Sequence, residues 1–138
     1  EEAREAFLKA LELDPKSAEV LYNLGMVALT IGETAEAADS FQKALALAPD
    51  HVGALYELGR LRMTQDNLKE GLARLDRAVK LSPNHTQAHY QRAMALRRLG
   101  RLEESKEEFD IFTRLEKEDR ERRKIVDRKL LTPAKPPQ

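Results

Sequence analysis

Two histidines lie four residues apart, and this spacing lets one helix present two imidazoles to a metal ion. His85 and His89 are separated by Thr86, Gln87 and Ala88, none of which is acidic, and the spacing marks no third ligand. A protein zinc site needs at least three ligands from the chain. We therefore interpret both histidines as structural residues and predict no metal site.

A run of carboxylates is the second candidate for chemistry. It comprises Glu103, Glu104, Glu107, Glu108 and Asp110, interleaved with basic residues. Such a pattern is typical of the outer, solvated face of an amphipathic helix. The chain has no Cys, and it contains no phosphate loop, nucleophile elbow or dinucleotide fingerprint. We predict that the protein is not an enzyme, with no catalytic residue and no cofactor.

Composition narrows the function classes further. The chain has 138 residues, with 24 Lys and Arg against 24 Asp and Glu, and is 41% hydrophobic and 35% charged. A zero net charge argues against a nucleic-acid partner, and no apolar stretch reaches the roughly 20 residues of a membrane helix, so no membrane insertion is expected. The chain starts at Glu1 without Met, which is consistent with a longer precursor and leaves the localisation unknown.

The elements that position these residues recur every 34 residues. Pro15, Pro49 and Pro83 close similar apolar phrases at that interval, and the three tyrosines keep it as well. Taking each proline as position 32 gives units at 18–51, 52–85 and 86–119, preceded by half a unit at 1–17.

This pattern resembles the tetratricopeptide repeat, a helical hairpin with characteristic large and small residues. The first full unit supplies Leu21, Leu24, Gly25, Ala28, Ala37, Phe41, Ala44 and Pro49. The second supplies Leu55, Leu58, Gly59, Gly71, Leu75, Ala78 and Pro83, with Arg62 in place of an alanine. The resemblance implies an all-α fold, a right-handed solenoid of antiparallel helix hairpins, in which residues 1–17 are the second helix of a truncated repeat.

Small residues recur at fixed positions of the 34-residue unit because the two helices of each hairpin must approach closely there. Gly25 and Gly59 are expected where the two helices of a hairpin cross, because a side chain there would hold the backbones apart. Gly32 and Gly100 are expected in the turns with positive φ, and Asp66 with Asn67 takes that place in the middle unit.

The third unit departs from the repeat pattern. His89, Arg92, Phe112 and Lys117 replace a large apolar residue, a leucine, an alanine and the proline. Without the proline we expect its second helix to continue as a charged capping extension at 120–131, followed by a Pro-rich tail at 132–138. Exposed apolar residues of this extension are expected to fold back or to meet a partner: Ile125, Val126, Leu130 and Leu131.

A tetratricopeptide array exposes a concave groove built from the first helix of each unit, and the resemblance assigns partner contacts to it. The expected groove residues are Tyr22, Asn23, Met26, Tyr56, Glu57, Arg60, Met63, Tyr90, Gln91, Met94, Arg97 and Arg98, with Thr64 at an equivalent position. Tyr and Met suit apolar partners, and amides suit an extended backbone. The alternative is that Tyr at this position and Met at helical spacing serve packing.

Arginines concentrate near the end of the groove. Arg92, Arg97, Arg98 and Arg101 form its densest basic patch, which would suit an acidic peptide. A solvated face balanced by Glu103 and Glu104 is the simpler interpretation.

The sequence does not match the subclass that clamps the carboxylates of a chaperone tail. The clamp requires Lys, Asn and Arg, whereas the corresponding residues are Tyr22, Met26, Glu57, Gln87 and Gln91. We therefore predict a protein-interaction scaffold or adaptor with a protein or peptide ligand in the groove. The alternatives are a structural or oligomerising segment of a larger protein, including an enzymatic one, which self-associates through its unfinished N-terminal end, and RNA binding.

Net charge hides a polarity along the chain. Residues 1–51 carry 10 acidic and 4 basic side chains, a balance of minus 6, whereas residues 120–138 carry 7 basic and 2 acidic side chains, a balance of plus 5. An acidic end opposed to a basic tail favours head-to-tail contact or an oriented partner.

Overall fold

The protein is an all-α solenoid in a computed structural model that describes residues 1–132, 135 and 137. Most of the expected Pro-rich tail therefore lies outside the described residues. The described part contains seven helices and no strand. The helices are α1 (Glu2–Leu13), α2 (Ala18–Thr30), α3 (Thr34–Leu47), α4 (Val52–Thr64), α5 (Leu68–Leu81), α6 (Thr86–Arg98) and α7 (Leu102–Leu131).

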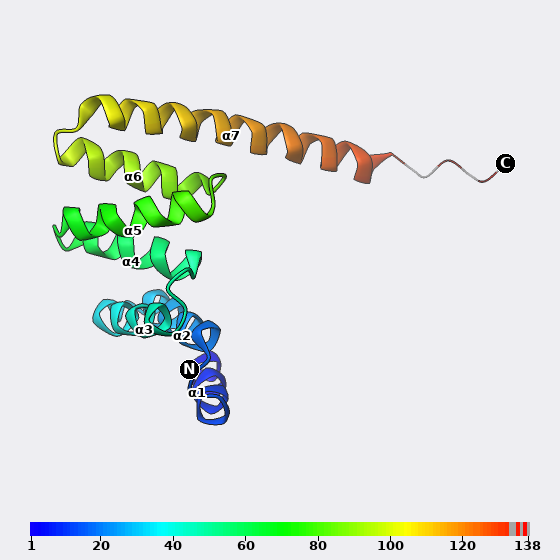
Figure 1. Ribbon diagram of the computed structural model, residues 1–138. Coiled ribbons are helices and arrows are strands. Elements are labelled where there is room, and N and C mark those ends of the chain that lie inside the picture. Colours follow the sequence, from blue (N-terminus) through cyan, green and yellow to red (C-terminus); the bar gives the residue numbers. More distant parts are fainter. Residues whose placement is uncertain (133–134, 136, 138) are drawn as a thin grey trace.

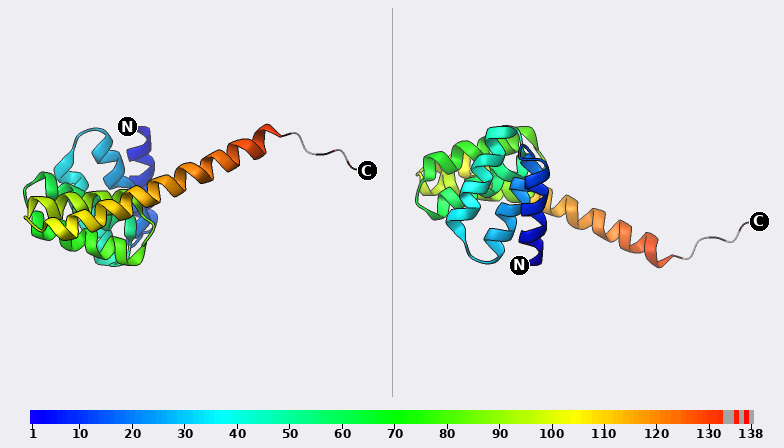
Figure 2. Two further views of the ribbon diagram at one scale, coloured as in Figure 1. Left: turned by 90° about the horizontal axis from the view of Figure 1, so that it is seen from above. Right: turned by 90° about the horizontal axis from the view of Figure 1, so that it is seen from below.

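The helices stack as antiparallel hairpins. Figure 1 shows α2 with α3, α4 with α5 and α6 with α7, arranged one above the other, with α1 at the opposite end from α7. The views along the stack in Figure 2 show α7 projecting sideways from it. Neighbouring hairpins bury leucines and alanines between them, and the largest fully buried side chains are Phe41, Leu55, Leu58, Leu75 and Leu96.

Glycines allow the helices of a hairpin to cross closely, as the sequence predicted. A Cβ atom on Gly25 would lie 2.5 Å from the Phe41 ring, and one on Gly71 would lie 2.9 Å from the carbonyl oxygen of Gly59. Both distances are below van der Waals contact, so a Cβ atom would require the Phe41 ring to move in the first case and the backbone of α4 to move in the second.

The turns inside the hairpins also follow the prediction. Gly32 and Gly100 adopt φ values of 81° and 77°, and Asp66 takes the same left-handed conformation with φ 58°. The residue after each of these positions donates its N–H to a carbonyl five residues earlier, for example Glu33 to Ala28 at 2.8 Å. This closure satisfies carbonyl groups at the end of the first helix and reverses the chain.

Side chains cap the first helix of every hairpin. Ser17 accepts the N–H of Val20 before α2, and the Nδ1 atoms of His51 and His85 accept the N–H groups three residues further on before α4 and α6. These bonds satisfy helix N–H groups that have no partner within the helix. The two histidines thus begin the groove-forming helices α4 and α6.

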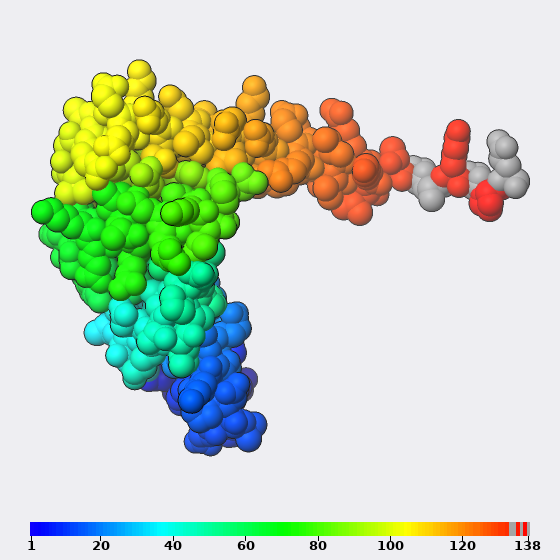
Figure 3. Space-filling model, viewed as in Figure 1, coloured from blue at the N-terminus to red at the C-terminus, as the bar shows by residue number. Residues whose placement is uncertain are grey.

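The last helix is more than twice as long as the others, and we call it the cap helix. Its first part packs on α6, with Leu115 and Ser105 buried, while its outward side chains are polar. From residue 120 onward every described side chain of α7 is exposed, and Figure 3 shows this part as an arm that leaves the body of the protein. Ile125, Val126, Leu130 and Leu131 lie on this arm, which does not fold back, and each is more than half exposed.

Among the residues that the structure describes, no helix combines the length and the apolar character that crossing a bilayer would require.

Candidate functional site

A hollow of about 340 Å³ opens between the first helices of the second and third units. Helix α4 contributes Arg60, Met63 and Thr64, and α6 contributes Tyr90, Gln91, Met94 and Arg98. Because α4 and α6 are the first helices of successive hairpins, equivalent positions on them face the same side of the array. Six of the twelve expected groove residues therefore meet at one place.

The floor of the hollow is apolar and its rim is polar. Met63 is buried and Met94 is half-buried, while the Tyr90 side chain is 39% exposed. The Tyr90 ring stands against Phe112 at a centroid distance of 5.2 Å, which supports it from behind. Flexible thioethers beside a supported aromatic ring can adapt to an apolar side chain.

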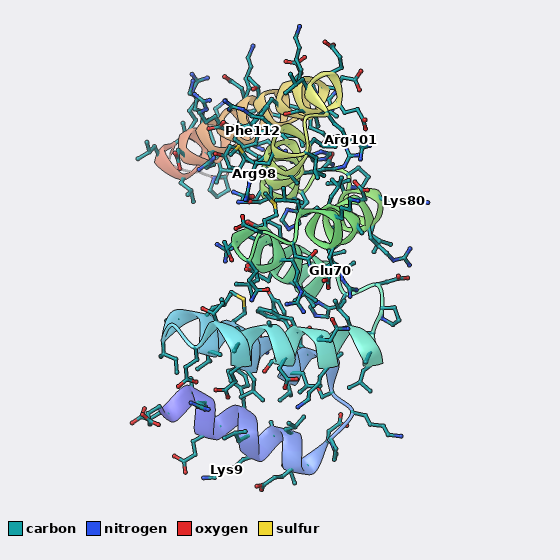
Figure 4. All side chains as sticks on the ribbon, turned by 90° about the vertical axis from the view of Figure 1, so that its left-hand side faces the viewer. Lys9, Glu70, Lys80, Arg98, Arg101 and Phe112 are labelled. Atoms are coloured by element: carbon teal, nitrogen blue, oxygen red, sulfur yellow. The ribbon has the colours of Figure 1, made fainter. Side chains whose placement is uncertain are left out.

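The two arginines of the hollow are already engaged within the protein. Arg98 donates to the Met63 carbonyl oxygen at 3.0 Å and to the Asp66 carboxylate, so it joins α6 to the end of α4. Arg60 donates to the buried carboxylate of Glu57 at 2.7 Å, and its Nε atom is buried with no hydrogen-bond partner in the described part of the chain. In Figure 4, Arg98 lies in the upper part of the stack, far from Lys9 of α1. The arginines thus contribute less charge than the sequence indicated.

The basic patch is largely neutralised by ion pairs. Arg92 pairs with Asp76 and Glu108, and Arg101 pairs with Glu104. Arg97 is exposed on α6 and does not line the hollow.

The other two tyrosines have a different environment from Tyr90. Tyr22 lies against His51 at a centroid distance of 4.7 Å, and Tyr56 lies against His85 at 4.8 Å. Each tyrosine therefore contacts the capping histidine of the next hairpin. Burial raises the pKa of Tyr22, with further contributions from the charges of Glu57 and Glu19, and burial also raises the pKa of Tyr56. Both rings are half-buried in the joints between units.

The remaining expected residues do not line the hollow. Asn23 and Met26 are half-buried on α2, one hairpin away. Glu57 is buried, so its carboxylate serves Arg60 before any ligand.

A second hollow, of about 590 Å³, lies where the cap helix leaves the stack. It is lined by Asn84, Arg114, Lys117, Glu118, Glu121 and Arg122. Several of these charges pair along α7, as Arg114 does with Glu118 at 3.9 Å. All its lining residues are charged or amide residues, without the methionines and the aromatic ring of the smaller hollow, so we favour the smaller hollow as the binding site.

One carboxylate expected on the outer face of the last helix is turned inward. Glu108 is buried and accepts hydrogen bonds from His89 and Arg92, so its assignment to the solvated face was wrong. His85 and His89 each use a ring nitrogen for protein contacts. Among the described residues, no group of three or more His, Asp or Glu is placed to hold a metal ion.

Comparison with known proteins identifies the family. Three tetratricopeptide repeat models match residues 1–52, 28–96 and 86–119. The chain belongs to the tetratricopeptide repeat family. None of the curated proteins searched matches the sequence.

Solved structures of MamA share the fold. A crystal structure of MamA superposes with a TM-score of 0.75 at 24% identity, covering 86% of this chain and 69% of that chain. MamA 41-end from Desulfovibrio magneticus RS-1 gives 0.71 at 26% identity, covering 83% and 65%. The chain thus spans about two thirds of the length of these structures. The fold and the family support a general role as a protein-interaction scaffold.

Proposed function

We propose that the protein recognises a peptide or protein segment in the groove formed by α2, α4 and α6, and that the hollow between α4 and α6 receives one apolar side chain of the ligand. The observation that carries the proposal is the combination of Met63, Met94 and Tyr90 in a hollow of about 340 Å³. The Gln91 side chain at the rim offers a donor and an acceptor to a ligand backbone. A scaffold without enzymatic activity is the role that suits this surface.

The proposed ligand differs from a chaperone tail held by its carboxylates. Arg60 and Arg98 are paired with Glu57 and Asp66, so the hollow carries little free positive charge. We therefore expect apolar contact, rather than a terminal carboxylate, to dominate the affinity.

Selection of peptides tests the proposal. A displayed library of random peptides is selected against the protein, and the affinity of the enriched peptides is measured by fluorescence anisotropy. Replacing Tyr90 by Ala should weaken an enriched peptide at least about tenfold, as expected for an anchor in a binding site. The matched control is Leu81→Ala on α5, because Leu81 is also 39% exposed but lies outside the hollow. Equal affinities of the two variants, or no enriched peptide, would contradict the proposal.

The tyrosines in the joints do not serve as equivalent tests. Tyr56 packs on His85 at the start of α6, so Tyr56→Ala would perturb the joint between units as well as a ligand contact. Tyr90 has no such histidine partner and reports on the hollow more directly.

Self-association is a second candidate, favoured by α1. No residue of α1 is buried, and Leu8 and Leu13 are exposed on it. We propose that this surface packs against further helices or a second copy. Sedimentation velocity of the protein and of Leu8→Lys should show assemblies only without the substitution, and a monomer in both cases would refute pairing of copies through α1.

A further inference from the structure

The two histidines at the start of α6 have opposite hydrogen-bonding surroundings. His85 Nδ1 accepts the N–H of Ala88 at 3.1 Å, so this nitrogen carries no proton. Burial lowers the pKa of His85. His85 is therefore held as the neutral imidazole that its capping role requires.

His89 instead faces an acceptor with each ring nitrogen. Its Nδ1 atom lies 2.6 Å from Glu108 Oε2, and its Nε2 atom lies 2.7 Å from the carbonyl oxygen of Pro83. A neutral imidazole has one donor and one acceptor, so one of its lone pairs would point at an oxygen atom here. The side chain is only 7% exposed, so water offers little relief. With Glu108 as the carboxylate that accepts from Arg92, both contacts are favourable only if both nitrogens carry protons.

The charges around His89 also sum to zero when both of its ring nitrogens carry protons. Glu108 also accepts from Arg92 Nη1 at 2.5 Å, and Arg92 Nε donates to Asp76 of α5 at 2.5 Å. The cluster thus holds two carboxylates and one guanidinium, and a positive His89 completes its neutrality. Buried charges are tolerated when they are paired and hydrogen-bonded.

The other charged groups near the cluster do not replace this proton. Glu104 of α7 lies closer to solvent and pairs with Arg101, which lowers the pKa of Glu104. His85 is the other titratable neighbour on α6, and it is held neutral.

The cluster stands where the preceding unit has an apolar joint. Leu55 and Leu58 occupy the equivalent positions on α4 and are almost completely buried. In the third unit, hydrogen bonds through His89 and Arg92 connect α5, the segment before α6, α6 itself and α7. The attachment of the cap helix therefore includes charged groups where the preceding joint is apolar.

We propose that His89 carries both ring protons in the folded protein, and that the cap helix α7 is attached to the array through a proton-dependent joint that weakens as the pH rises. An unfolded histidine releases its proton near about pH 6.5. Above that value the folded state would hold more protons than the unfolded state, so stability falls with increasing pH. The contribution is complete below about pH 6.5, and the unfolding equilibrium constant rises by up to about tenfold per pH unit above it.

Nuclear magnetic resonance of the unaltered protein with ¹⁵N-labelled histidine tests the protonation state. At about one pH unit above the ordinary histidine value of about 6.5, both ring nitrogens of His89 should be protonated, whereas His85 should keep one unprotonated nitrogen. An unprotonated ring nitrogen on His89 under these conditions would overturn the proposal.

Unfolding in urea as a function of pH tests the joint. The urea midpoint of the protein should decrease as the pH rises above neutrality, and His89→Gln should remove most of this decrease. The matched control is His51→Asn, which retains a capping acceptor outside the cluster and should keep the decrease. An equal decrease in His89→Gln and the parent protein would overturn the proposal. If His89→Gln does not fold, the ring-nitrogen measurement decides alone.

Discussion

Replacement of Gly71 by Ala should destabilise the protein, although alanine is the better helix former. Gly71 lies inside α5, where a new Cβ atom would stand 2.9 Å from the carbonyl oxygen of Gly59 and 2.9 Å from Met63 Cγ. The oxygen belongs to the backbone of α4, which cannot move without separating the two helices of the hairpin. The substitution therefore has two opposite effects: it raises the helix propensity of α5, and it disturbs the packing of α5 against α4.

Both contributions have known magnitudes. An interior Gly→Ala replacement stabilises a helix by about 1 kcal/mol. Inserting a methyl group into a close-packed contact costs about 1–3 kcal/mol, and a rigid backbone neighbour places Gly71 in the upper part of this range. We expect a net loss of about 1–2 kcal/mol in the free energy of unfolding.

Gly53→Ala is the matched control for this experiment. Gly53 also lies in a helix, and its new Cβ would stand 2.9 Å from Tyr22 Cζ, an atom near the tip of a half-buried side chain. Because that ring can turn away, we expect a change of less than about 1 kcal/mol. Urea unfolding followed by far-ultraviolet circular dichroism measures both variants. A Gly71→Ala protein as stable as Gly53→Ala would refute the explanation by close helix crossing.

Three further substitutions test the caps and the core by urea unfolding. Ser17→Ala removes the acceptor for the Val20 N–H and should lower the free energy of unfolding by about 1 kcal/mol. Asn67→Ala should cost less, because Asn67 makes no side-chain cap bond. The opposite order would contradict the capping role of Ser17. The pKa of His85 is lowered by burial, so the stability that its neutral ring contributes is lost as the pH falls. His85→Ser keeps a capping acceptor that does not titrate, and it should abolish this loss of stability at acid pH. If the loss remained in His85→Ser, the neutral cap would not be its cause. Phe41→Ala empties a fully buried site and should cost about 3–5 kcal/mol, whereas a loss below about 1 kcal/mol would show that the site collapses.

The hairpins could be predicted from the sequence because their determinants are local and repeated. Positive φ at Gly32 and Gly100 and the close approach of Gly59 and Gly71 follow from residue types at fixed positions of the 34-residue unit. Each such position is decided by backbone sterics within one hairpin. Three copies of the same constraint left little freedom for another fold.

Burial of Glu108 could not be predicted in the same way. Residues 103–110 span two helical turns and therefore cover more than one face, yet all five carboxylates were assigned to the solvated side. What turns Glu108 inward is the pair His89 and Arg92 on the neighbouring helix. Periodicity within one helix does not contain that information, although two polar residues at positions normally occupied by leucine indicated that a polar partner was needed.

The environments of the three tyrosines show a related limit. Tyr22 and Tyr56 occupy the same repeat position as Tyr90 but pack on the histidine that caps the first helix of the next hairpin. After the third unit, the ring of Tyr90 meets Phe112 of the cap helix instead. Groove residues at equivalent positions thus differ in exposure because their neighbours in the following unit differ.

The residues by which the third unit departs from the repeat pattern are best explained together, because they contact one another or the same helix. Phe112 stands where Ala44 and Ala78 are completely buried beneath the following hairpin, and its bulk fills that space while it supports Tyr90. His89 and Arg92 exchange an apolar joint for hydrogen bonds to Glu108, which fix the orientation of α7. Restoring leucine at His89 alone would leave Glu108 with one partner fewer in a buried site, and leaving a buried charge without its partner costs several kcal/mol. His89, Arg92 and Glu108 therefore depend on one another in attaching α7, while Phe112 supports Tyr90 at the hollow between α4 and α6.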